Sequence, residues 1–289
     1  MALDGTLKMK EGIEGARQSV SLMAMDGPLR TDGIKWLVEV PFAHRGFHTG
    51  DGIIPENSTA AFKRAIDYGY AIELDVRLSS DGKVVVFHDK SLYRMTGISK
   101  FIDDLTWEEI KHIKLLGSRY TIPLLEHVLK LVNGRVPMLI EVKNNGVPGP
   151  LEQALIDVLR DYKGHFAVQS FNPLSLRYFK QNAPQIIRGQ LSGSFKGENL
   201  MFFNKFLLRY LLLNGLSKPS YVAYEIGYFP KWLANLQRRM GIYLLGWTAK
   251  SPKDHERAKG IYDNVIFEGY MAQPFKKPLS VGKGPGILS

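Results

Sequence analysis

The chain has 289 residues, 45% of them hydrophobic, with a formal net charge of +10 and no cysteine. Its length suits one large core, because a single α/β barrel typically uses about 250 residues. The charge favours an anionic partner such as a phosphate compound or a membrane surface. Nucleic acid is not expected, because the basic residues are scattered and no recognised binding motif accompanies them. The absence of cysteine excludes a thiolate zinc site.

The sequence predicts a cytoplasmic protein. No apolar segment reaches the roughly 20 residues needed to span a bilayer. The amino terminus carries Lys8, Lys10 and Glu11 without an apolar stretch, so no signal peptide is expected.

Residues 1–35, rich in glycine and mixed charge, are expected to form an amino-terminal extension, either poorly ordered or a helix across the bottom of a barrel. The catalytic domain is expected over residues 36–275. Its first strand, residues 40–45, ends in His44-Arg45-Gly46, where the glycine lets the backbone approach a ligand.

A helix is predicted over residues 57–68, and we interpret Glu56 and Asn57 as its caps. The second strand, residues 70–77, carries Glu73 and Asp75. Because successive side chains of a strand alternate between its faces, both carboxylates point the same way.

Only a short turn at residues 79–82 separates this strand from the next, residues 83–88, which ends in His88-Asp89. The turn is too short for a crossover helix, so the barrel is irregular here. Asp89 is expected to orient His88 or to cap the next turn. Residues 90–122 then form a small insertion, in which Thr106 and Glu109 match a capping box.

The strand at residues 136–142 ends in Glu141, and Lys143 follows on the same face. Together with Glu73 and Asp75, Glu141 completes a set of hard oxygen ligands suited to Mg²⁺ or Ca²⁺. Three carboxylates and one divalent cation leave one net negative charge. Arg45 and Lys143 would reverse it and make the site favourable for phosphate.

Residues 200–213 predict a helix that is apolar nearly all round, with Lys205 and Arg209 on one face. A helix outside a barrel needs one buried stripe, so this one is a candidate for peripheral membrane contact. The alternative is packing against the amino-terminal extension or a second subunit. Further along, Trp247 is expected either to line a pocket or to fill the core. Residues 276–289 are predicted to form a disordered tail.

The motifs HRG, PEN, E-x-D-V, D-G-x-x-V-V-x-H-D and E-x-K, in this order and spacing, resemble the glycerophosphodiester phosphodiesterase family. The motifs extend from Pro41 to Lys143, and weaker similarity continues to Gly269. The resemblance implies an irregular TIM-type (β/α)₈ barrel with a small insertion after the His88 strand. It also implies metal-dependent hydrolysis of glycerophosphodiesters to sn-glycerol 3-phosphate and an alcohol.

Site roles also follow from the resemblance. His44 and His88 would be the catalytic acid and base, with water or the neighbouring glycerol hydroxyl as nucleophile. The resemblance implies that one divalent cation is held by Glu73, Asp75 and Glu141. It also implies that the phosphate is contacted by Arg45 and Lys143. The late segment at residues 263–269 lacks the Thr-Asp of the relatives, which leaves the final loop of the pocket open.

Two alternatives remain from the sequence. A lysophospholipase D-like hydrolase acting at a membrane surface would share the fold and suit the apolar segment at 200–213. Toxin relatives of that kind carry Asp where this chain has Glu141, and they use disulfides that this chain cannot form. A phosphate-binding regulatory barrel would lack a histidine or a metal acid, and none is missing here.

Overall fold

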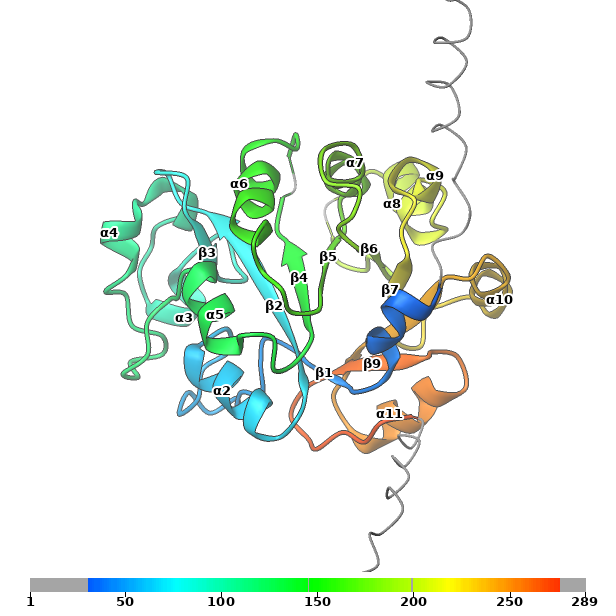
Figure 1. Cartoon of the computed structure of the whole chain (residues 1–289), viewed down its shortest axis with the longest axis horizontal. Coiled ribbons are helices and arrows are strands. Elements are labelled where there is room, and N and C mark those ends of the chain that lie inside the picture. Colours follow the sequence, from blue (N-terminus) through cyan, green and yellow to red (C-terminus); the bar gives the residue numbers. More distant parts are fainter. Residues whose placement is uncertain (1–30, 145, 199, 276–289) are drawn as a thin grey trace, which may run out of the picture. The chain divides into compact units, whose positions relative to one another are not determined.

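The computed structural model describes residues 31–144, 146–198 and 200–275 (Figure 1). From Ile34 onward these residues form a barrel of eight parallel strands, closed where the last strand pairs with the first. The predicted TIM-type barrel is confirmed. The strands are β1 (Phe42–Ala43), β2 (Ala71–Leu78), the antiparallel β3 (Val84–Val86), β4 (Met138–Val142), β5 (Phe166–Ser170), β6 (Arg188–Ser192), β7 (Tyr221–Glu225), β8 (Tyr243–Ala249) and β9 (Asn264–Phe267).

Helices connect the parallel strands and lie outside the barrel (Figure 1). Across the described ranges, no helix is both long and apolar enough to cross a bilayer. The helices are η1 (Thr31–Val38), α2 (Thr59–Asp67), α3 (Tyr93–Thr96), η2 (Ile102–Asp104), α4 (Trp107–Ile110), α5 (Leu125–Val132), α6 (Pro150–Leu159), α7 (Pro173–Asn182), α8 (Phe202–Arg209), α9 (Asn214–Ser217), α10 (Lys231–Arg239) and α11 (Pro252–Lys259).

Side chains that alternate along the strands build two hydrophobic layers, one inside the barrel and one beneath the helices. Tyr221 is a fully buried residue of the inner layer. A Cβ on Gly189 would lie 2.0 Å from its ring, so the neighbouring strand has glycine at this position. Trp36 and Leu37 are buried against the same layer, and Trp36 stacks on His165 just before β5. Residues 34–38 therefore cover the amino ends of the strands.

The barrel departs from regular alternation after β2. The antiparallel β3 follows β2 directly, with Val76 opposite Val86. Residues after β3 form α3, η2 and α4 around a separate hydrophobic cluster that includes Met95, Ile102 and Ile110. The predicted irregularity is confirmed, and this cluster lies next to the strand end that carries His88.

One local prediction is confirmed and another is wrong. Thr106 and Glu109 form the expected capping box at the start of α4. Helix α2 is capped by Ser58, whose Oγ accepts a hydrogen bond from the Ala61 N–H, and not by Glu56 or Asn57. The predictions for residues 1–30 and for the tail at 276–289 lie outside the described residues.

Candidate functional site

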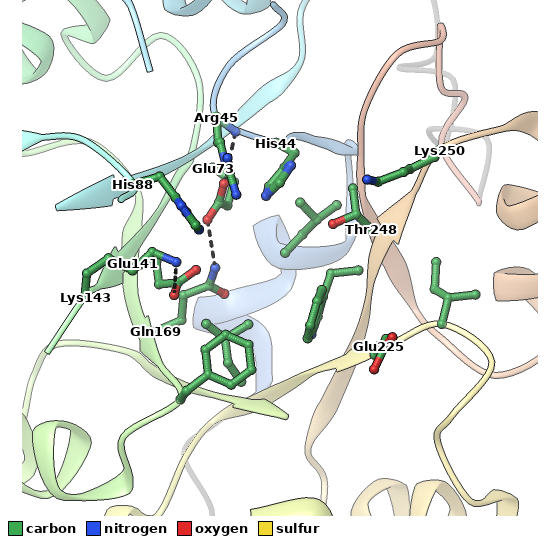
Figure 2. A pocket seen from close by; sticks show the side chains of 15 residues that line it. His44, Arg45, Glu73, His88, Glu141, Lys143, Gln169, Glu225, Thr248 and Lys250 are labelled. Carbon is green, nitrogen blue, oxygen red and sulfur yellow. Dashed lines mark hydrogen bonds and ion pairs between the residues drawn. The ribbon is translucent and has the colours of Figure 1, made fainter. Parts of the chain in front are cut away.

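A pocket opens at the carboxyl ends of the barrel strands, where parallel strands gather their terminal side chains (Figure 2). One half of its lining is mostly polar and lies on or just after β1 to β5, and the other half lies on or just after β6 to β9. The lining residues are His44, Arg45, Glu73, His88, Glu141, Lys143, Gln169, Phe171, Leu191, Glu225, Ile226, Trp247, Thr248, Lys250 and Ile266.

Three buried carboxylates converge at the base of this site. Glu73 and Asp75 lie two residues apart on β2, and Asp75 is in register with Glu141 on β4. One oxygen of each carboxylate lies within 4.8 Å of the others. The sequence expectation that strand alternation would bring these acids together therefore agrees with the geometry.

Burial and mutual repulsion govern the ionisation of the three acids. Burial, together with the charges of Asp75 and Glu141, raises the pKa of Glu73 well above its ordinary value. Burial likewise raises the pKa of Glu141, although Lys143 opposes the shift. The pKa of Asp75 is lowered, because Lys143, His88 and Arg45 outweigh the effect of its burial. The surroundings of the cluster therefore disfavour the ionised forms of Glu73 and Glu141 and favour that of Asp75.

Two cations flank the acids. Lys143 Nζ lies 2.6 Å from Glu141 Oε1 and 3.1 Å from Asp75 Oδ1. Arg45 Nε lies 3.5 Å from Asp75 Oδ2, and the Arg45 backbone N–H donates to Glu73 Oε2 at 3.0 Å. Both predicted phosphate contacts therefore lie beside the carboxylates.

The turn after β1 directs the Arg45 N–H toward Glu73. Arg45 has a φ of 54° and Gly46 a φ of 79°, so the chain reverses immediately after the strand. A Cβ on Gly46 would lie 2.8 Å from the Ala61 Cβ on α2. Glycine is required at this position by both backbone conformation and close packing.

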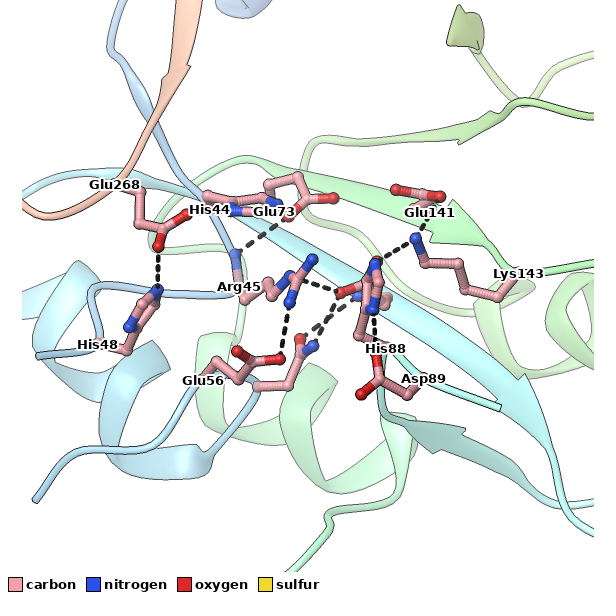
Figure 3. A network of polar contacts seen from close by, with 12 residues as sticks. His44, Arg45, His48, Glu56, Glu73, His88, Asp89, Glu141, Lys143 and Glu268 are labelled. Atoms are coloured by element: carbon pink, nitrogen blue, oxygen red, sulfur yellow. Dashed lines mark hydrogen bonds and ion pairs between the residues drawn. The ribbon is translucent and has the colours of Figure 1, made fainter. Parts of the chain in front are cut away.

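A chain of polar contacts joins this turn to the insertion, and Figure 3 shows its Arg45–Glu56 and His88–Asp89 contacts. Glu56 accepts hydrogen bonds from Arg45 and from Arg94 on α3, and Arg94 also donates to Asp89. Asp89 contacts His88, with 2.6 Å between Oδ1 and Nδ1. Asp89 therefore orients His88, which was one of its two predicted roles.

Asn57 is also part of the site. Its Nδ2 donates to Asp75 Oδ2 at 2.8 Å, and its side chain is buried. The interpretation of Glu56 and Asn57 as caps is wrong because their side chains fix Arg45 and Asp75 instead.

Both predicted histidines line the pocket, and each has a carboxylate on Nδ1. His44 Nδ1 lies 2.9 Å from Glu268 Oε2, and His88 has Asp89. Figure 2 shows the two rings on either side of Glu73. Burial lowers the pKa of His44, and burial with the charges of Lys143 and Arg45 lowers the pKa of His88 to about 4. Both imidazoles are therefore neutral at neutral pH.

Sequence reasoning missed Glu268, which immediately follows β9. Its hydrogen bond with His44 lowers its own pKa to about 2, so it stays ionised. His48 Nε2 lies 3.9 Å from the other Glu268 oxygen. Its position could have indicated its role, because Glu268 follows an apolar strand directly. The acids identified from the sequence also lie in or at the end of apolar strands.

The other wall of the pocket combines aromatic and charged groups. Trp247 lines the pocket, packs edge-on against Phe171 and donates its Nε1–H to the Ala223 carbonyl. Trp247 thus borders the pocket and also packs against the inner hydrophobic layer. Glu225 and Lys250, which sequence reasoning also missed, extend this wall.

Comparison with known proteins agrees with this barrel and its polar strand ends. The model of the glycerophosphoryl diester phosphodiesterase family matches residues 44–267, and the chain belongs to this family. It is 39% identical over 162 residues to a glycerophosphodiester phosphodiesterase of Caldanaerobacter subterraneus, a match covering 52% of this chain and 65% of that protein. A Bacillus altitudinis glycerophosphodiester phosphodiesterase is 39% identical over 158 residues, covering 50% and 63% respectively. The chain thus matches slightly less than two thirds of these relatives' length.

A solved structure extends the similarity in fold to most of the described barrel. The Oleispira antarctica phosphodiesterase, in complex with the product sn-glycerol-3-phosphate, aligns with a TM-score of 0.67 and 23% identity. The alignment covers 83% of this chain and 95% of that one. It establishes the shared fold.

Proposed function

We propose that this protein hydrolyses glycerophosphodiesters to sn-glycerol 3-phosphate and an alcohol. The main support for this proposal is that Glu73, Asp75 and Glu141 each bring one carboxylate oxygen to within 4.8 Å of the others. Two cations and two histidines, each bonded to a carboxylate, lie beside them at the same mouth of the barrel. Family membership supports the same reaction class. The cysteine-free sequence is compatible with a reducing compartment, and we propose that the protein acts in the cytoplasm.

Glu73, Asp75 and Glu141 would hold one divalent cation, Mg²⁺ or Ca²⁺. The donor set fits, because hard cations prefer carboxylate oxygens. Burial and neighbouring carboxylates raise the pKa values of Glu73 and Glu141, and a bound cation would oppose both effects. Such a cation would supply electrostatic stabilisation to charge developing on the phosphate oxygens.

Arg45 and Lys143 would bind the phosphate. Their two positive charges lie at the edge of the acid cluster, where they already contact Asp75. A substrate phosphate entering from the pocket would compete for these contacts and reorient the Lys143 ammonium. Trp247 would bound the pocket on the side away from the acids.

The histidines would transfer the protons. Because Asp89 and Glu268 occupy the Nδ1 positions, the Nε2 atoms are available toward the pocket. A neutral imidazole is competent as a base, so one histidine would deprotonate the nucleophile, either water or the adjacent glycerol hydroxyl. The other, in its imidazolium form, would give the leaving alkoxide its Nε2 proton, and proton exchange with water would then restore both histidines.

The decisive experiment measures glycerol 3-phosphate released from glycerophosphocholine by the purified chain. We expect release with Mg²⁺ or Ca²⁺ and its loss after chelation. Glu73→Gln should be inactive, whereas His112→Ala, at an exposed histidine outside the pocket, should behave as wild type. No release with any divalent cation would refute the proposed activity.

A second candidate is lysophospholipase D-like hydrolysis. The observation that favours it is the exposure of Phe202 and Phe203 on α8, which would suit a substrate held in a lipid surface. Comparing turnover of lysophosphatidylcholine and glycerophosphocholine by the same preparation distinguishes the two.

A further inference from the structure

Helix α8 lies outside the barrel with none of its residues buried. The side chains of Phe202 and Phe203 are 85% and 64% exposed. A helix that covers a barrel normally buries an apolar stripe and turns polar residues outward. Here the largest apolar side chains are exposed, and packing among the described residues does not cover them.

Ring contacts extend this apolar area to α10. Phe206 packs on Tyr210 with ring centroids 4.9 Å apart, and Tyr210 stacks on Trp232 at 6.2 Å. On α10, Trp232 and Leu236 are exposed one helical turn apart, whereas Leu233, Ala234 and Gln237 are buried. We call these outward-facing side chains the α8–α10 surface: Met201, Phe202, Phe203, Phe206, Trp232, Leu236 and Met240.

The sequence segment that carries this surface is strongly basic. Between residues 199 and 253 the sequence has eight lysines and arginines and a single acid, Glu225. Glu225 lines the pocket, so no acid of this segment is left for the outer face. Lys231 and Arg239 are exposed on α10 itself. Such a surface would repel a second copy of this basic chain and attract anionic headgroups.

The surface also adjoins the pocket mouth. Helices α8 and α10 follow β6 and β7, whose ends contribute Leu191 and Glu225 to the pocket. In the loop before α8, Phe195 packs against Phe171 of the pocket wall, with ring centroids 6.0 Å apart. The last turn of α8 contacts the ends of both strands, because Ser192 Oγ donates to the Leu208 carbonyl and the Tyr224 hydroxyl donates to the Arg209 carbonyl. The surface therefore lies beside strand ends that border the pocket.

We propose that the α8–α10 surface docks this protein onto anionic lipid bilayers, with its aromatic side chains in the headgroup region and the pocket mouth beside the lipid. Aromatic side chains favour this interfacial region, and flanking cations add attraction to anionic lipids. The inference rests on residues outside the polar site and does not depend on the proposed hydrolysis.

The test is cosedimentation of the full chain with vesicles of phosphatidylcholine, with or without phosphatidylserine. We expect binding to the phosphatidylserine vesicles and its weakening at high salt, because salt screens surface charges. Phe202→Ser/Trp232→Ser should lower the vesicle affinity at least tenfold. Lys231→Gln/Arg239→Gln should lower the preference for phosphatidylserine.

The matched control is Ile53→Ser/Tyr93→Ser, which removes two exposed apolar side chains elsewhere and should bind vesicles as wild type does. An unchanged circular dichroism spectrum and thermal unfolding midpoint of the Phe202 and Trp232 variant would show an intact fold. Equal vesicle binding by that variant, or no binding by wild type, would overturn the proposal. So would self-association of wild type that the same substitutions abolish.

Discussion

His44 and Glu268 lie 224 positions apart in the sequence, yet Nδ1 of the histidine is 2.9 Å from Oε2 of the glutamate. The contact exists because β1 and β9 are hydrogen-bonded neighbours, with Ala43 in register with Phe267. The glutamate fixes the orientation of the imidazole and favours its protonated form. We therefore assign Glu268 as a positioning residue for His44.

Replacing Glu268 by Gln should slow turnover roughly 10- to 100-fold, the usual effect of losing a partner that orients a functional side chain. Because Glu268 raises the His44 pKa against the effect of burial, the acid limb of the pH–rate profile should also move to lower pH. Glu268→Asp should restore part of the rate. An unchanged profile would contradict the assignment.

His44→Ala and His88→Ala should each lower turnover by roughly 10² to 10⁴-fold, because each removes a proposed proton-transfer group. Circular dichroism and thermal unfolding should stay close to wild type, since both side chains border an open pocket. His112→Ala is the matched control. Near-normal turnover of either variant would remove that histidine from the mechanism.

Addition of Mg²⁺ or Ca²⁺ should raise the midpoint of thermal unfolding, because a ligand that binds only the folded state stabilises it, by about 2.7 kcal/mol at a hundredfold excess over Kd. Glu73→Gln should abolish this increase. The same variant without metal should be at least as stable as wild type, since it removes a buried repulsive charge. A metal-induced shift of equal size in the variant would exclude Glu73 as a ligand.

Without metal, the stability of wild type relative to Glu73→Gln should fall as the pH rises above 4.5, the ordinary pKa of glutamate. Because the pKa of Glu73 is raised in the folded state, the folded state keeps a proton that the unfolded state has already lost. The free energy of unfolding therefore falls as the pH rises, by at most about 1.4 kcal/mol per pH unit. The histidines are common to both proteins and cancel in the difference. Urea unfolding of both proteins in the presence of a chelator, across a series of pH values, measures the difference between their free energies of unfolding. A difference that stays constant with pH would contradict the raised pKa.

Gly189→Ala should lower the free energy of unfolding by roughly 1–3 kcal/mol, because the new methyl group would overlap the Tyr221 ring inside the barrel. Gly215→Ala is the control, since a Cβ there meets no atom within 4 Å. Urea unfolding of both variants gives the comparison. Equal stabilities would mean that Tyr221 moves aside without cost.

Local patterns were sufficient to predict the acid-bearing strands. Glu73, Asp75 and Glu141 each interrupt an apolar, β-branched run, and strand alternation fixes the face on which they lie. The short turn before β3 likewise predicted the irregular step, because no helix fits within it. These features depend on neighbouring residues, which a sequence displays directly.

Features that depend on barrel closure could not be predicted in this way. Nothing near Glu268 indicates that β9 returns to β1, and so its contact with His44 was missed. Asn57 was misread because its partner, Asp75, lies on another strand. The excess apolar surface of the segment at 200–213 was recognised, but the exposed apolar stripe of α10 was not, because no neighbouring residue indicates which face α10 buries.

The closing pair of strands also has a consequence for synthesis on the ribosome. The acids of β2 and β4 emerge early, whereas β9, the strand between β1 and β8, is made last. A nascent chain that lacks β9 leaves hydrogen-bonding edges of β1 and β8 open, and open edges invite pairing with other chains. Nascent chains halted before residue 264 should therefore depend on chaperones, whereas chains released after Glu268 should not.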